Sequence, residues 1–230
     1  MRRQAERLNG DQRTRILDVS AQLFGHRGVD GASINDIAEH VHLSKATIYH
    51  YFVSKEEIYS EIVISTLERL VAVLQAAVST ADRPEHQLRS YMLAYAQFLD
   101  DNFWPFVTVL TGFGGIRRDN QRSRAILLRR QAREIMRDII RSGVKNGDFR
   151  KTDVSTTAIA ILSMLNWMYR WYNRDGRKRA VQFAAEFAEL TIQGLSQDSK
   201  VSRQKVVVSG ARAMNAVSGP GAARRRGQSR

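Results

Sequence analysis

The side chains best suited to contact nucleic acid are concentrated in one short segment near the N-terminus, KATIYHYF (45–52). Ammonium, hydroxyl and imidazole groups donate hydrogen bonds to phosphate oxygens and base edges, and the segment contains no carboxylate that would repel a polyanion. Its candidate contacts are Lys45, Thr47, Tyr49 and His50. Three expected helix starts, whose free backbone N–H groups also attract phosphate, carry further candidates at Ser33, Ser44 and Lys55. The sequence therefore predicts a phosphate- and base-contacting surface between residues 33 and 55.

A second cluster of aromatic and basic residues, NWMYRWYNRDG (166–176), follows an apolar run. On a helix its polar and basic members share one side, and the neighbouring side holds two tryptophans one turn apart. These residues are Asn166, Trp167, Arg170, Trp171, Asn173 and Arg174. Packing in the core or at a dimer contact would account for the tryptophans, but a guanidinium among aromatic rings needs an anion, a carbonyl group or a ring face. The cluster therefore predicts either packing or the lining of a ligand pocket.

A pocket at this cluster would combine a basic rim with an apolar wall. The rim consists of Arg174, Arg177, Lys178 and Arg179, which would equally suit the negative end of a helix dipole. The wall would come from an earlier segment, through Phe98, Phe103, Trp104, Phe106, Phe113 and Ile116. The residues thus predict a cationic patch of the size of a phosphate beside an apolar cavity.

Nothing in the chain predicts catalysis or metal binding. The sequence has no cysteine, and the histidines at 40, 42 and 50 lack the cysteine and carboxylate partners of a metal site. The segment GFGG (112–115) follows no strand and has no neighbouring lysine, so it is not a phosphate-binding loop. Serine and histidine residues form no recognisable nucleophile–base pair. We therefore expect no enzyme activity, no metal and no cofactor.

The elements that position both clusters are predicted to be helices throughout, because apolar residues recur at helical spacing and alternating strand patterns are missing. A first helix should open at Asp11 and end at Gly28, and Ser33 and Ser44 should cap two short helices joined by the turn VHLS (41–44). A long helix should follow Ser54. The remaining predicted helices are about 85–102, 103–111, 119–146, 154–174 and 177–195. The expected fold is all-α, with about nine helices.

This pattern predicts three regions, which are a helix-turn-helix DNA-binding domain (1–53), a helical effector-binding and dimerisation domain (54–198) and a disordered basic tail (199–230). The tail holds +8 of the net charge of +13, so the charge alone is weak evidence for a folded DNA-binding surface. We see no signal peptide and no run approaching the ~18 apolar residues of a membrane span. The longest apolar run is near 158–168. A cytoplasmic protein without membrane contact is expected.

The N-terminal helices resemble those of a known family. The segment ASINDIAEHVHLSKATIYHYFVSKEEIY (32–59) resembles the DNA-binding domain of the TetR family of bacterial repressors. The residues in register are Ala38, Leu43, Ser44, Thr47, Ile48, Tyr49, Tyr51, Phe52, Ser54, Lys55 and Glu56. One departure is His42, which stands where the family usually has a glycine in the left-handed backbone conformation. Histidine is among the residues that tolerate this conformation.

The resemblance implies a homodimeric transcriptional repressor that binds a palindromic double-stranded DNA operator and is released by a small-molecule effector. Its dimer would form through the last two helices, where alanines such as Ala188 would allow close approach. The segment MLNWMYRWYNRDG (164–176) further resembles the TetR branch that controls fatty-acid and sterol degradation and responds to acyl-CoA thioesters. The implied effector contacts are Phe98, Trp104, Phe106, Phe113, Asn166, Trp167, Arg170, Trp171 and Arg174. Two alternatives remain open: an efflux or detoxification regulator that responds to a neutral hydrophobic compound, and a ligand-independent DNA-binding dimer.

Overall fold

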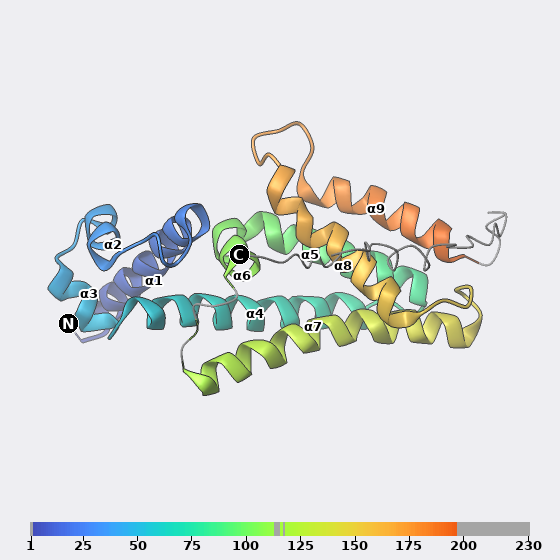
Figure 1. Cartoon of the computed structure of the whole chain (residues 1–230), viewed down its shortest axis with the longest axis horizontal. Coiled ribbons are helices and arrows are strands. Elements are labelled where there is room, and N and C mark those ends of the chain that lie inside the picture. The colour runs from blue at the N-terminus through green and yellow to red at the C-terminus, as the bar shows by residue number, and fades with distance from the viewer. Residues whose placement is uncertain (1, 113–115, 117, 197–230) are drawn as a thin grey trace, which may run out of the picture. The chain divides into compact units, whose positions relative to one another are not determined.

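The computed structural model describes residues 2–112, 116 and 118–196, with side chains from residue 11 onwards. Within these ranges the fold is all-α, as predicted (Figure 1). The helices are α1 (Arg2–Arg27), α2 (Ile34–Val41), α3 (Lys45–Tyr51), α4 (Lys55–Ser79), α5 (Pro84–Asp101), α6 (Phe103–Thr111), α7 (Asp119–Asn146), α8 (Val154–Trp171) and α9 (Ala180–Leu195). The predicted basic tail and Phe113 lie outside the described residues.

The short helices α2 and α3 begin where their serines cap them. The Ser33 hydroxyl accepts a hydrogen bond from the Asp36 backbone N–H at 3.2 Å, and the Asp36 carboxylate accepts one from the Ser33 N–H at 2.7 Å. Ser44 accepts in the same way from the Thr47 N–H at 3.0 Å. These contacts satisfy N–H groups that have no partner inside the helix. The predicted starts of both helices are confirmed.

The turn between α2 and α3 has the predicted backbone geometry. His42 lies in the left-handed region, with φ of 54° and ψ of 44°. The next residue, Leu43, donates its N–H to the Ala38 carbonyl oxygen at 3.0 Å, which closes the turn. Histidine therefore occupies the position where a glycine would be free of strain.

Three predicted boundaries are wrong. Helix α1 begins at Arg2 and not at Asp11, and α9 begins at Ala180 and not at Arg177. Helix α8 ends at Trp171, because Tyr172 adopts an extended backbone and its buried hydroxyl bonds to Asp100 on α5. The predicted placement of Asn173 and Arg174 on one helix side with Asn166 and Arg170 is therefore also wrong.

The core of the larger helical part is built around α4, which packs against α5, α6 and α7. Figure 1 shows α4 and α7 running alongside each other. By length and mean hydropathy α4 would be able to cross a membrane, and it is the single such helix among the described residues. Its side chains at Tyr59, Val63 and Leu74 are instead fully buried within the protein. This is the environment of a core helix.

Helix α9 uses its small residues inside the subunit. Ala180, Ala184 and Ala188 are fully buried, and α9 packs mainly against α5. Small side chains let two helices approach closely, and here the second helix belongs to the same chain. The expectation that Ala188 faces a second subunit is therefore wrong.

Candidate functional site

Four of the predicted DNA contacts lie around one shallow hollow of about 410 Å³ between α2, α3 and the start of α4. Its predicted members are Ser33, Lys45, Tyr49 and Lys55. The hollow also includes Asn35 and Asp36, which were not predicted as contacts. The structure therefore brings residues from three helix starts into one surface that combines cations, hydroxyl groups and backbone N–H groups.

The outer face of α3 is accessible to a large partner. Lys45 and His50 are exposed, and Tyr49 is 48% exposed, with the Lys45 ammonium 6.0 Å from the Tyr49 ring centre. Behind this face Ile48 and Phe52 are buried, which fixes the helix on its support. A helix held by its inner side and offering a basic, aromatic outer side is suited to the major groove of DNA.

Thr47 and Ser33 are less free than the sequence suggested. The Thr47 hydroxyl lies 2.8 Å from the Ser44 hydroxyl, so the two form one capping group. The Ser33 hydroxyl donates to the Asp36 carboxylate at 2.6 Å. Hydrogen bonds from the Ser33 hydroxyl and backbone, with Arg27 nearby, lower the pKa of Asp36. Because this carboxylate is then an anion beside the start of α2, it competes with a DNA phosphate there.

Lys55 has a structural role that sequence reasoning missed. Its ammonium group donates to the carbonyl oxygens of Val29 at 2.7 Å and Ala32 at 2.8 Å. An ammonium has three donors, so a phosphate could still be reached by the third. Both carbonyls come from the turn before α2, a contact that no local sequence pattern signals. Lys55 therefore joins the first turn of α4 to the entrance of the helix-turn-helix.

The side chains of the aromatic cluster at the end of α8 point in different directions, some into the protein and some to solvent. Asn166 points inward and accepts a hydrogen bond from the hydroxyl of Tyr95, whose pKa is raised by burial. Trp167 is 60% exposed, and the Arg170 guanidinium lies 5.7 Å from the centre of its ring. Trp171 packs edge-on against Phe183 of α9, with ring centres 5.0 Å apart. The Arg170 guanidinium therefore contacts the face of the Trp167 ring.

The predicted apolar wall is likewise spread over several places. Phe106 is fully buried in edge-to-face contact with Tyr95 and Phe98. Trp104 turns the other way and packs against His26 at the end of α1, with ring centres 4.0 Å apart and the ring planes tilted by 42°. Phe98 borders a hollow of about 630 Å³ between α4 and α5. Its apolar lining also includes Ala72, Val73 and Ala94, and its polar lining consists of Arg69, Gln97, Asp101 and Asn102, with the Arg69 guanidinium donating to Asn102.

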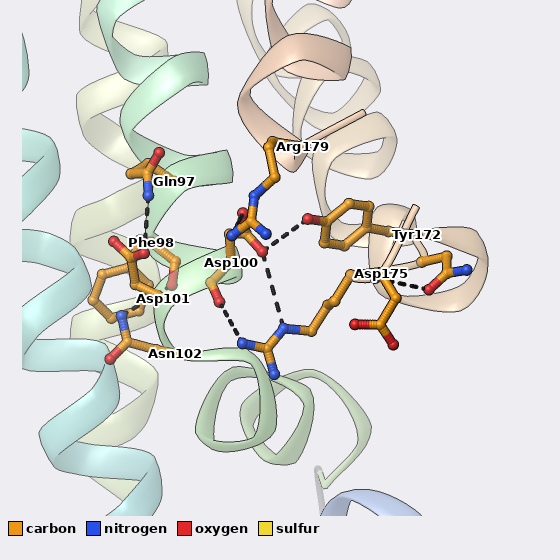
Figure 2. A network of polar contacts seen from close by, with 10 residues as sticks. Gln97, Phe98, Asp100, Asp101, Asn102, Tyr172, Asp175 and Arg179 are labelled. Atoms are coloured by element: carbon orange, nitrogen blue, oxygen red, sulfur yellow. Dashed lines mark hydrogen bonds and ion pairs between the residues drawn. The ribbon is translucent and has the colours of Figure 1, made fainter. Parts of the chain in front are cut away.

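Two residues of the predicted basic rim converge on one buried carboxylate. Asp100 on α5 is 2% exposed, and Figure 2 shows it between Tyr172 and Arg179. The Arg179 guanidinium lies 2.7 Å from Asp100 Oδ2, and Arg174 Nε lies 4.0 Å from Oδ1. Lys178 pairs with Glu186 at 2.6 Å. The rim is therefore partly neutralised in this structure.

Two family models match the chain, and together they span most of its helices. The model for bacterial regulatory proteins of the tetR family matches residues 16–62, and the model for a tetracyclin repressor-like C-terminal domain matches residues 81–195. The first model ends within α4, and the second begins just before α5. The first match contains every predicted DNA contact, and the second contains the aromatic cluster of α8.

Individual relatives agree with these models. The HTH-type transcriptional repressor KstR2 of Rhodococcus jostii is 24% identical, over 80% of this chain and 91% of its own. The crystal structure of the TetR family regulator PfmR from Thermus thermophilus has a TM-score of 0.73 and 41% identity, over 79% of this chain and 99% of its own. The structure of AibR in complex with isovaleryl coenzyme A and operator DNA has a TM-score of 0.70 and 21% identity, over 80% of this chain and 98% of its own. As the sequence predicted, the chain belongs to the TetR family of bacterial DNA-binding transcriptional regulators and not to a family of enzymes.

Proposed function

We propose that the protein is a homodimeric cytoplasmic repressor that binds a palindromic operator and leaves it when a small-molecule effector binds. Dimerisation is supported by a row of exposed apolar side chains along α8 and α9. Its members are Ile159, Met164, Trp167, Trp171 and Leu190. Soluble monomers seldom expose so many large apolar side chains on adjacent helices, whereas a subunit interface covers them.

The spacing of these residues suits a symmetric interface. Trp167 and Trp171 lie one turn apart on α8, and Ile159 lies about two turns before Trp167, so the three form a broad stripe that winds partly around the helix. Leu190, on the neighbouring helix α9, is 66% exposed. A two-fold axis near this stripe would pair α8 and α9 with the same helices of a second copy, giving a four-helix interface.

Such a dimer carries two copies of α3, each with the exposed Lys45 and Tyr49. Two recognition helices related by a two-fold axis match an inverted repeat, with half-sites about 34–36 Å apart or slightly more. The test is footprinting on DNA next to the gene of the protein, together with sedimentation of the free and bound protein. Protection of two symmetric half-sites by a dimer is the expected result. Protection of one asymmetric half-site would contradict the proposal.

The proposed effector is an acyl-CoA thioester. The hollow beside Phe98 has apolar lining for a hydrocarbon group, and its volume is in the range of small-molecule sites. Its polar lining includes the guanidinium of Arg69 and the carboxylate of Asp101, so we assign the anionic groups of the effector to arginine and not to the whole hollow. Arg170 near the end of α8 and Arg174 just after it add basic surface. One structural neighbour also supports this class, because AibR was solved with isovaleryl coenzyme A and operator DNA.

Calorimetry separates this effector from its alternatives. The purified dimer would be titrated with acyl-CoAs of several chain lengths, the matching free acids and coenzyme A, and then tested for operator release. We expect acyl-CoAs to bind and release the operator more effectively than either part alone. Binding by free acids or neutral hydrophobic compounds alone would favour the detoxification alternative. If no compound in the panel binds the protein or raises its melting temperature, the ligand-independent dimer is favoured.

A further inference from the structure

The carboxylate of Asp100 lies at the meeting point of α5 and the segment between α8 and α9. Asp100 Oδ1 accepts a hydrogen bond from the Tyr172 hydroxyl at 2.8 Å, and Oδ2 pairs with Arg179 at 2.7 Å (Figure 2). Burial and this hydrogen bond raise the pKa of Tyr172, so its hydroxyl remains a donor. A buried carboxylate with a hydrogen-bond donor and a guanidinium already has good partners.

Arg174 is a second cation at this carboxylate, and it is held more loosely. Its Nε is 4.0 Å from Asp100 Oδ1, and one terminal nitrogen donates to the Asp100 backbone oxygen at 3.4 Å, whereas the Arg179 guanidinium lies 2.7 Å from Oδ2. Both arginine side chains are about half exposed, so the contrast between them lies in these distances. Because Tyr172 and Arg179 already satisfy the carboxylate, moving Arg174 away leaves no unpaired buried charge. The guanidinium of Arg174 is therefore exchangeable in a way that Arg179 is not.

The other contact of Arg174 leads toward the DNA-binding helices. Its guanidinium carbon lies 5.4 Å from the centre of the Phe103 ring, at the first residue of α6. The Phe103 ring packs edge-on against Trp104, with ring centres 5.1 Å apart, and Trp104 packs against His26 in the last turn of α1. A Cβ added at Gly25 would lie 2.7 Å from Trp104 Cε3, so α1 and α6 are in tight contact here.

We propose that Arg174 is an exchangeable latch between the effector region and the DNA-binding helices. In the unliganded protein it rests between Asp100 and Phe103 and holds the start of α6 against α1. An anionic group of the effector, such as a phosphate, draws the guanidinium away, so that Phe103 and Trp104 release α1 and operator affinity falls. This inference rests on the proposed function, since operator binding is its readout.

A double-mutant cycle on operator affinity tests the latch. The variants are Arg174→Gln, His26→Ala and the double variant, each checked for dimerisation and melting temperature. Both single variants should weaken operator binding. The fold-loss of affinity in the double variant should differ from the product of the two single fold-losses by about threefold or more, because the effects of uncoupled distant sites multiply. Arg89→Gln, which breaks an exposed ion pair between α5 and α9, is the matched control and should combine independently with His26→Ala.

Independent effects of Arg174→Gln and His26→Ala would overturn the latch. Arg174→Lys serves as a second variant, because it keeps the charge near Asp100 but loses the planar guanidinium over Phe103. Arg174→Lys should show the same coupling to His26→Ala as Arg174→Gln does. If the wild-type protein binds no palindromic operator, the proposed function fails before the cycle begins, so the two failures are distinguishable.

Coenzyme A tests the anionic trigger separately. Added to the protein–operator complex, it should weaken operator binding by the wild-type protein and by Arg89→Gln, while leaving Arg174→Gln unaffected. An equal response of Arg174→Gln and the wild type would overturn the role of Arg174 in sensing the anion. A wild-type protein indifferent to coenzyme A would overturn the phosphate as its trigger.

Discussion

The ammonium group of Lys55 lies 2.7 Å from the carbonyl oxygen of Val29, so the first turn of α4 is fastened to the turn that precedes α2. Residues 26 positions apart in the sequence are joined in this way, and the contact fixes the helix-turn-helix relative to the long helix that supports it.

Replacing this ammonium group should weaken both the fold and DNA binding. Lys55→Met leaves the two carbonyl oxygens of Val29 and Ala32 without their donor, which should cost about 1–2 kcal/mol in the free energy of unfolding. Urea denaturation measures this loss, and fluorescence anisotropy with operator DNA measures the affinity. The control is Lys145→Met, an exposed lysine in the last turn of α7. Equal stability of the two variants would contradict the structural role of Lys55.

The exposed side of α3 should contribute affinity without contributing stability. Lys45→Ala and Tyr49→Ala should each weaken operator binding, by about 1–3 kcal/mol where a base edge is contacted. Their melting temperatures should stay close to that of the wild type. Val53→Ala removes a side chain that is 72% exposed just after α3, and it should bind the operator normally. Unchanged affinity for both test variants would mean that α3 is not the recognition helix.

A charge on the exposed stripe of α8 should separate the subunits. Ile159→Glu places a carboxylate where the proposed interface is apolar, so sedimentation should show monomers with reduced operator affinity. Ile126→Glu on α7 is the matched control, because Ile126 is 57% exposed and Ile159 is 54% exposed. Monomers from the control and dimers from Ile159→Glu would place the interface on α7.

Two glycine-to-alanine changes should shift stability in opposite directions. A Cβ at Gly143 would overlap the ring of the buried Phe149, so Gly143→Ala should destabilise the protein by about 1–3 kcal/mol. A Cβ at Gly194 has open space around it, and Gly194→Ala should stabilise α9 by about 0.5–1 kcal/mol. Thermal unfolding monitored by circular dichroism measures both. A Gly143→Ala variant as stable as the wild type would refute the packing described for Gly143, and a destabilised Gly194→Ala variant would refute the open space described for Gly194.

The capping carboxylate of Asp36 should make stability depend on pH. Because its folded-state pKa is lowered, its contribution is present above the unfolded pKa of about 4 and is lost as the pH falls through the folded value. The stability difference between the wild type and Asp36→Asn should therefore be largest near neutral pH and shrink in acid. Denaturation at a series of pH values checks this. A difference that grows in acid would reverse the assigned direction of the pKa shift.

Local signals allowed the sequence to predict the starts of α2 and α3 and the left-handed turn between them. Ser33, Ser44 and His42 act on backbone groups within a few residues, so their roles can be recognised from the sequence alone. The end of α8 depends instead on Tyr172 bonding to Asp100, 72 positions earlier. The same limit explains why the second role of Lys55 and the partial neutralisation of Arg174 were not predicted. Contacts between distant segments leave no periodic pattern in the sequence.

The surface between α1 and α6 also limits how this protein can be recombined with its relatives. The Thr108 hydroxyl on α6 donates to the Ala21 carbonyl oxygen of α1 at 3.1 Å, a few residues from where Trp104 meets Gly25. A DNA-binding domain transplanted from another regulator would need a glycine at the position of Gly25 and an α1 surface that fits Trp104. Chimeras that exchange operator preference should therefore carry α6 together with α1, because a junction drawn only at the start of α4 divides a single packed surface.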